Sequence, residues 1–341
     1  MVRALLSHGT TDSFARGVVG RILTFNCHEA YVHLLGKLGA ELDIIDALPG
    51  RYTQRWDERM RPVPQRARLL TLEQVQAGAA YDAAIAHNLT DLVQLRDLDV
   101  PKVLVLHVSL AARCDEEPKA PPPAIVSAHL AKYLELTRAT AVAVSRSKAT
   151  SWGLECPVVR PCADPGEYDG FDGELAVALR VANQVLSRQR RFAWDDHCAL
   201  VGDLPFKLVG HNPGIDGAEP ASSWQALRQL YRRHRAYVHT AGHGLDDGYN
   251  LALVEAMTTG MPVVSTALAE SPIEDGKNGL VDRDPRRLHA GLAALLVDRA
   301  RAIELGKRAR ETALREFSVD GFVGGWQRAL ELAVRRWATR N

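Results

Sequence analysis

The residues with the clearest chemical potential lie in the segment 246–268, DDGYNLALVEAMTTGMPVVSTAL. From Leu251 to Leu268 this segment carries a single charge, the carboxylate of Glu255. Burying a carboxylate is costly unless a partner compensates it, so we expect Glu255 to have one. The partner is either a group of the protein, through a salt bridge or loop amides, or a bound ligand.

A turn and a helix start precede this carboxylate. Asp247 and Gly248 belong to an expected tight turn, and Asn250 is the expected N-cap of a buried helix over 251–259. The free N–H groups and the dipole at a helix N-terminus favour an anion, and glycine lets the backbone approach a ligand closely. Asp247 and Glu255 could therefore bracket a phosphate-bearing ligand.

The elements that position these residues alternate between short β-type runs and helical patterns, which predicts parallel sheets covered by helices. The expected strands lie at 21–26, 41–46, 81–87, 102–108 and 140–145, and then at 177–183, 206–210, 235–239 and 262–265. A helix with Tyr31 and Leu34 on its apolar face should end at Gly39, and the helix over 251–259 should end at Gly260.

Two doubly wound α/β domains follow from this order. The stretch 161–173 is rich in Pro, Gly and Asp and marks the connection between them. We predict domains at 1–165 and 166–320, with a terminal helix over 321–341 that can cross back to the first domain. The segment 115–123, DEEPKAPPP, has no apolar periodicity and is expected to be an exposed, extended loop.

The composition narrows the class of protein. The chain has 341 residues, enough for two domains, and its 42 Lys and Arg against 41 Asp and Glu leave a net charge of +1. That balance argues against a nucleic-acid partner. No uncharged apolar run reaches the roughly 18 residues of a membrane span, and no secretory signal is evident. Five scattered cysteines fit neither a disulfide framework nor a zinc site, so we expect a cytoplasmic protein.

Several other chemistries fail on spacing. His28 and His33 are five apart and cannot share a metal on a helix, and His239 and His243 span a glycine loop without the glutamate of a metalloprotease. No metal is expected. The sequence also lacks GxGxxG after a strand, GxxxxGK[ST] and GxSxG, which disfavours dinucleotide oxidoreductases, P-loop NTPases and α/β-hydrolases.

The segment 247–255 resembles the acidic-x7-acidic motif of family 4 glycosyltransferases of the GT-B fold, and EAMTTGMPVVST is similar to the family's sequence after the second acid. SPIEDGKNGLV at 271–281 resembles its next element. The resemblance implies two Rossmann-like domains facing across a cleft, with the acceptor on the N-terminal side and a UDP- or GDP-sugar on the C-terminal side. It also implies retention of anomeric configuration and no required cofactor or metal.

Donor-binding roles follow from the same resemblance. Asp247 would contact the donor sugar, the backbone of Gly248, Tyr249, Asn250 and Leu251 the diphosphate, and Glu255 the ribose. The first acid of the family is usually glutamate, so Asp247 is one methylene shorter.

The family's phosphate-binding basic residues are matched only in part. At the position of its usual first arginine this chain has Asn183, to which the resemblance assigns a place in the donor-binding site. Arg188 stands at the later basic position, and Arg191 is a second choice. An arginine fork can neutralise a departing diphosphate, whereas the alternative is a solvated basic turn.

Two histidines follow expected strands of the first domain. His107 matches the family's histidine that faces the donor sugar, and His87 ends a neighbouring strand, where it could contact sugar or acceptor. Functional groups of open α/β sheets gather beyond the carboxyl ends of the strands. A structural role in hydrogen bonding is the alternative for each histidine.

The sequence therefore predicts a hexosyltransferase-type enzyme of carbohydrate biosynthesis that moves a sugar from a nucleotide-diphosphate donor to a hydroxyl of a glycan, lipid or small molecule. His107, Asp247 and Arg188 would be its catalytic groups. Two alternatives stay open: a GT-B sugar-nucleotide epimerase, and a non-catalytic sugar-nucleotide-binding partner subunit, which the absent arginine at Asn183 favours. Membrane association is expected only for a lipid acceptor, and the sequence leaves the oligomeric state undetermined.

Overall fold

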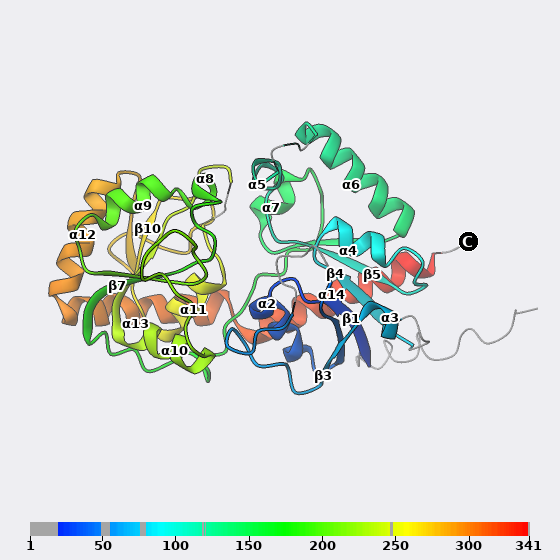
Figure 1. Ribbon diagram of the computed structural model, residues 1–341, viewed down its shortest axis with the longest axis horizontal. Coiled ribbons are helices and arrows are strands. Elements are labelled where there is room, and N and C mark those ends of the chain that lie inside the picture. The colour runs from blue at the N-terminus through cyan, green and yellow to red at the C-terminus, as the bar shows by residue number, and fades with distance from the viewer. Residues whose placement is uncertain are drawn as a thin grey trace, which may run out of the picture.

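The computed structural model describes residues 20–48, 55–75, 80–117, 119, 121–245 and 248–339. It contains two parallel sheets, each forming its own α/β unit, which lie side by side (Figure 1). The N-terminal domain is built on the first sheet and the C-terminal domain on the second.

The first sheet has the strand order β3-β2-β1-β4-β5-β6, the order of a dinucleotide-binding Rossmann fold. Its strands are β1 (Arg21–Phe25), β2 (Glu41–Ile45), β3 (Ala67–Leu70), β4 (Ala83–Ala86), β5 (Lys102–Leu106) and β6 (Thr140–Ala143). The connecting helices are α2 (Glu29–Leu35), η1 (Gly36–Leu38), α3 (Leu72–Val75), α4 (Leu89–Gln94), α5 (Leu110–Asp115), α6 (Pro123–Thr137) and α7 (Arg146–Ser151). Successive strand residues enter different cores, Ile22 one and Leu23 the other, so both faces of the sheet are covered.

The second sheet has the order β11-β10-β9-β7-β8, the pattern of a flavodoxin-like doubly wound sheet. Its strands are β7 (Leu175–Val181), β8 (Phe206–Val209), β9 (His234–His239), β10 (Val263–Thr266) and β11 (Gly279–Asp282). Around it lie α8 (Gln189–Phe192), α9 (Trp194–Val201), α10 (Trp224–Arg233), α11 (Leu251–Thr259), α12 (Pro285–Val297) and α13 (Arg299–Glu316).

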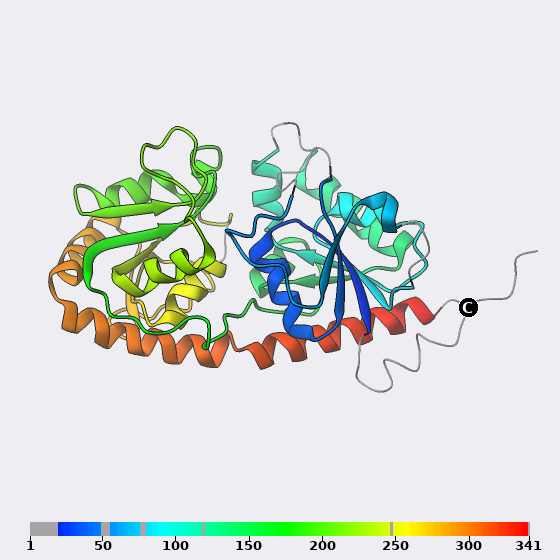
Figure 2. The ribbon, with the colours of Figure 1, turned by 60° about the horizontal axis from the view of Figure 1, so that its bottom comes forward.

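The last helix, α14 (Val319–Ala338), follows α13 and packs on the first sheet (Figure 2). Phe322, Trp326 and Leu330 lie in the same core as Ile22 and Val105, and Trp326 is fully buried. The C-terminal end of the chain thereby ties the two domains together. Within the described part of the chain, the helices are too short or too polar to cross a lipid bilayer.

The predicted doubly wound architecture is confirmed, but two strands were missed. β3 is an edge strand whose middle residues are exposed, so it shows no alternation of apolar and polar residues. β11 is only four residues long and lies at the far edge of the second sheet. The domain boundaries at 1–165, 166–320 and 321–341 stay predictions.

Candidate functional site

A cavity of about 670 Å³ lies between the domains, at the carboxyl ends of strands from both sheets. Ligands of open α/β sheets bind at this edge, where the strand order reverses. The predicted site residues that line it are His87, His107, Asn183, Arg188, Arg191, Tyr249, Asn250, Leu251 and Glu255. Asp247 lies outside the described residues, so its predicted contact with the donor sugar stays a prediction.

The start of α11 is built as the sequence predicts. The Asn250 side chain accepts a hydrogen bond from the Leu253 N–H at 2.9 Å, and Gly260 ends the helix in a left-handed conformation. Gly248 has φ +107°, and a Cβ there would come within 2.9 Å of the Ser271 nitrogen. Gly248 is not among the residues that line the cavity, so the structure gives it a role in folding the turn.

Glu255 has a partner from the other domain. Its carboxylate forms an ion pair with the guanidinium of Arg61, which precedes β3, and also accepts a hydrogen bond from the Tyr231 hydroxyl at 3.1 Å. The side chains of Arg61 and Glu255 are only 4% and 6% exposed. Burial has the largest single effect and lowers the pKa of Arg61, but the Glu255 carboxylate, Tyr168 and Tyr231 together outweigh it and raise the pKa. The protein's own salt bridge, one of the alternatives for Glu255, is therefore present.

Arg61 is held firmly at this place. The Trp56 indole donates to the Arg61 carbonyl at 2.7 Å, and the guanidinium lies 5.7 Å from the ring centre of Trp224. The sequence does not point to Arg61, because this residue belongs to a polar, proline-containing stretch with no local sign of burial. Its partner Glu255 is 194 residues away.

The basic stretch after β7 also pairs with the other domain. Glu116 Oε1 lies 2.7 Å from Arg191 Nη1 and 3.7 Å from Arg188 Nε, while Arg190 forms an ion pair with Asp115. These two acids belong to the segment 115–123. The expectation of an exposed loop is wrong for both, because α5 ends at Asp115 and their side chains are only 17% and 22% exposed.

Asn183 lines the cavity but is used to shape a turn. Its side-chain oxygen accepts from the His211 N–H at 2.7 Å, beside Gly210, whose φ is +135°. A Cβ at Gly210 would collide with the carbonyl of Ala182. The position that carries an arginine in the resembled family is therefore part of a tight backbone contact here.

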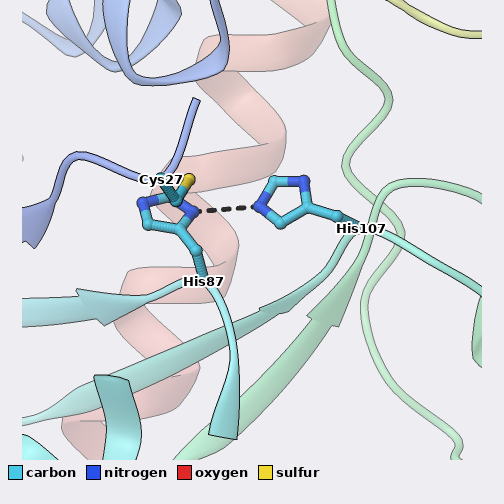
Figure 3. Close-up of side chains that lie close together, drawn as sticks. All are labelled: Cys27, His87 and His107. Carbon is cyan, nitrogen blue, oxygen red and sulfur yellow. Dashed lines mark hydrogen bonds between the residues drawn. The ribbon is translucent and has the colours of Figure 1, made fainter. Parts of the chain in front are cut away.

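The two predicted histidines stand next to each other (Figure 3). His87 Nδ1 lies 2.9 Å from His107 Nε2, and His87 Nε2 lies 2.9 Å from the hydroxyl of Thr24. Thr24 donates its one proton to the Ile85 carbonyl, so it accepts from His87 Nε2. His87 Nδ1 is then the acceptor, and His107 Nε2 donates to it. Burial lowers the pKa of His87 to about 3 and that of His107 well below 6.5, so both rings are neutral.

These histidines form a group with Cys27 that their sequence spacing does not predict, because the three residues come from different strand ends. One ligand atom from each of the three lies within 4.8 Å of the others, and nitrogen and thiolate donors suit zinc. Two nearby side chains are cationic, however: besides burial and the neighbouring His87 and His28, Lys148 and Arg191 lower the pKa of His107. Such a field opposes a bound cation and favours an anion.

The charge of the cavity comes from both domains. His28 follows β1 and lines the cavity, and its pKa is lowered to about 4 by burial and then by Arg61, Arg188 and Arg191. The positive charges of three arginines are therefore felt at His28, on the wall of the cavity. This wall can hold an anionic group such as a diphosphate.

The comparisons with known proteins agree with this geometry. Residues 173–298, which run from the start of β7 to the end of α12, match the family described as Glycosyl transferases group 1. No curated protein matches the sequence.

Solved structures share the fold over nearly the whole chain. HepE from Anabaena, crystallised with UDP and glucose, matches with a TM-score of 0.65 at 15% identity, over 91% of this chain and 99% of HepE. Sucrose-phosphate synthase from Thermosynechococcus elongatus matches at 0.67 and 13%, over 92% and 100%. WaaG, a glycosyltransferase of lipopolysaccharide biosynthesis, matches at 0.59 and 13%, over 88% and 96%. The chain has the GT-B fold, and residues 173–298 carry a glycosyl transferase group 1 domain, which supports a transferase enzyme.

Proposed function

We propose that this chain transfers a glycosyl group from a UDP- or GDP-sugar to an acceptor hydroxyl, with retention of anomeric configuration, as family 4 glycosyltransferases do. The C-terminal domain would hold the donor and the N-terminal domain the acceptor. One observation carries the proposal: the first turn of α11, Glu255, the two arginines Arg188 and Arg191, and His107 converge on one cavity.

The roles within that cavity follow from charge and position. N–H groups in the first turn of a helix and arginine side chains both stabilise phosphate oxygens. The donor's diphosphate would therefore bind between Leu251 at the α11 N-terminus and Arg188, with Arg191 beside it. Glu255 would accept hydrogen bonds from the ribose once it leaves Arg61. Asp247 would contact the donor sugar.

Catalysis would then be electrostatic. As the anomeric bond breaks, negative charge grows on the diphosphate, and preorganised donors lower the barrier most where charge develops. His107 is neutral, and its Nε2–H is directed to His87, so it would act as a fixed polar contact to the sugar and not as a cation. No protein nucleophile is assigned.

HepE has been crystallised with UDP-glucose, which supports a nucleotide sugar as donor. No metal is needed in this scheme, since arginines supply the positive charge. Treatment with EDTA should leave the transfer rate unchanged; a loss of activity that zinc restores would assign the group of Cys27, His87 and His107 to a metal instead.

The five free cysteines support a reducing compartment, which we propose is the cytoplasm.

The test is a panel of UDP- and GDP-sugars, first by thermal shift and then with acceptors that carry free hydroxyls. A ligand specific to the folded state raises the melting temperature. We expect one sugar nucleotide to do so and to release nucleoside diphosphate only when an acceptor is present. Formation of an epimer without acceptor, or tight binding without turnover across the acceptor panel, would contradict the proposal.

A further inference from the structure

Among the residues that the structure describes, the charged donor-binding groups Glu255, Arg188 and Arg191 are each paired with an opposite charge of the other domain. Glu255 of the C-terminal domain holds Arg61 of the N-terminal domain. In the other direction, Arg188 and Arg191 of the C-terminal domain hold Glu116 of the N-terminal domain. The N-terminal domain therefore supplies a carboxylate, Glu116, to the two arginines and a guanidinium, Arg61, to the Glu255 carboxylate.

Glu116 is chemically the closest substitute for a phosphate in this arrangement. A carboxylate and a phosphate both accept charge-assisted hydrogen bonds from guanidinium groups, and one arginine N–H cannot serve both. The Glu116 carboxylate contacts Arg191 at 2.7 Å and approaches Arg188 at 3.7 Å, and all three residues line the cavity.

The backbone fixes Glu116 in this place. It caps the C-terminal end of α5, where its N–H donates to the Ala112 carbonyl at 3.0 Å. The neighbouring acid behaves differently: Glu117 pairs with Arg113 of its own domain at 2.7 Å and is 51% exposed. Both acids line the cavity, but of the two only Glu116 is paired with the C-terminal domain in the described contacts.

We propose that Glu116 sets the donor affinity by competing with the donor's diphosphate for Arg191 and Arg188. This inference rests on the proposed function in one respect, the placement of the diphosphate at these arginines. Binding of the donor has to displace the Glu116 carboxylate, and the ion pair re-forms when nucleoside diphosphate leaves. The protein holds its own anion in the donor site, which weakens donor binding and assists release of the product.

In the same way, Arg61 would compete with the donor's ribose for the Glu255 carboxylate, but this pair is less suitable for a test. Both side chains are buried, so removal of Arg61 leaves a buried carboxylate and also destabilises the fold. The Glu116 pairs are 16–34% exposed, so their loss costs little stability and the effect on binding can be isolated.

The experiment is calorimetric titration of the full chain with UDP, GDP and inorganic pyrophosphate. The variants are Glu116→Gln and the matched control Glu117→Gln, which removes the same charge one residue away. We expect Glu116→Gln to tighten binding about fivefold, the equivalent of about 1 kcal/mol, and Glu117→Gln to change it much less. In an Arg191→Ala background the gain from Glu116→Gln should largely disappear, because the contested group is gone.

Equal affinity of wild type and Glu116→Gln overturns the inference while leaving the proposed function intact. Equal gains in binding affinity from Glu116→Gln and Glu117→Gln also overturn it, because they would show a general effect of negative charge near the site and not competition for Arg191. Failure of all three probes to bind any variant overturns both proposals. Tighter binding in Glu116→Gln without turnover of any sugar nucleotide supports the inference and contradicts the proposed function.

Discussion

The Glu255 carboxylate of the C-terminal domain is bound to the guanidinium of Arg61 from the N-terminal domain, and both side chains are more than nine-tenths buried. The sequence distance between them is 194 residues. The carboxylate that the sequence singles out as needing a partner therefore has one from the other domain, and both residues line the cavity. Under the proposed function, donor binding and the contact between the domains would depend on the same side chain.

The first prediction concerns the stability of this pair. Arg61→Met leaves Glu255 buried among neutral groups such as the Tyr231 hydroxyl, and removal of one partner of a buried pair costs about 3–5 kcal/mol. Urea unfolding should show this loss, and adding Glu255→Gln should recover part of it. The matched control Arg59→Met, whose ion pair with Asp57 is 64% exposed on the arginine side, should leave the unfolding free energy nearly unchanged. Equal effects of Arg61→Met and Arg59→Met would contradict the burial of the pair.

The second prediction separates neighbouring arginines. Arg188→Ala and Arg191→Ala each remove a donor at the cavity wall and should lower the transfer rate by about 10- to 100-fold, since each removes positive charge where the leaving diphosphate develops negative charge. Arg190 is 79% exposed and does not line the cavity, so Arg190→Ala serves as the control and should retain activity. The measurement is acceptor-dependent release of nucleoside diphosphate. If Arg190→Ala loses as much activity as Arg188→Ala, the assignment fails.

The third prediction concerns the tautomers of the histidines. Thr24→Val removes the acceptor for His87 Nε2–H, so the His87–His107 bond loses its fixed direction. We expect kcat to fall by about tenfold with little change in donor KM, because the donor's phosphates bind elsewhere. Thr24→Ser keeps the hydroxyl and should restore kcat. A fall of kcat in both Thr24→Val and Thr24→Ser, or an effect on donor KM alone, would show that Thr24 does not position His107.

The fold is predicted well where the signals are local. The helix over 251–259, its N-cap Asn250 and its terminal Gly260 are confirmed, because capping and left-handed glycines are encoded within a few residues. β3 was missed because an exposed edge strand has no buried face to leave a pattern.

The site is predicted less completely, for a physical reason. Glu255 could be recognised as a charge in an apolar segment, but its partner could not, because an ion pair between distant segments leaves no mark on either one. Glu116 was assigned to an exposed loop for the same reason. The cavity joins Arg61 and Glu116 to the predicted residues only after both domains are folded.

The fourth prediction concerns acid stability. Burial lowers the pKa of His197 to about 2 and that of His87 to about 3. In the unfolded chain both histidines titrate near 6.5, so the stability that their neutral forms support is complete above pH 6.5 and is lost as the pH falls towards the folded values. Each histidine should lower the free energy of unfolding by up to about 1.4 kcal/mol for every pH unit below 6.5.

His197 is the better residue to change, since it lies away from the cavity and stacks on Trp194 at 4.6 Å between ring centres. His197→Phe keeps the ring and removes the titration. Urea unfolding at several pH values between 6.5 and 4 should show that the free energy of unfolding falls less steeply with decreasing pH in this variant than in wild type. An unchanged slope would mean that His197 already takes up its proton in the folded state.

The most direct test is a crystal structure of the protein with its sugar nucleotide bound. The account predicts that Glu255 has left Arg61 for the ribose and that the diphosphate lies at the N-terminus of α11 against Arg188 and Arg191. A nucleotide bound elsewhere, with Glu255 still paired to Arg61 and Glu116 still on Arg191, would contradict it.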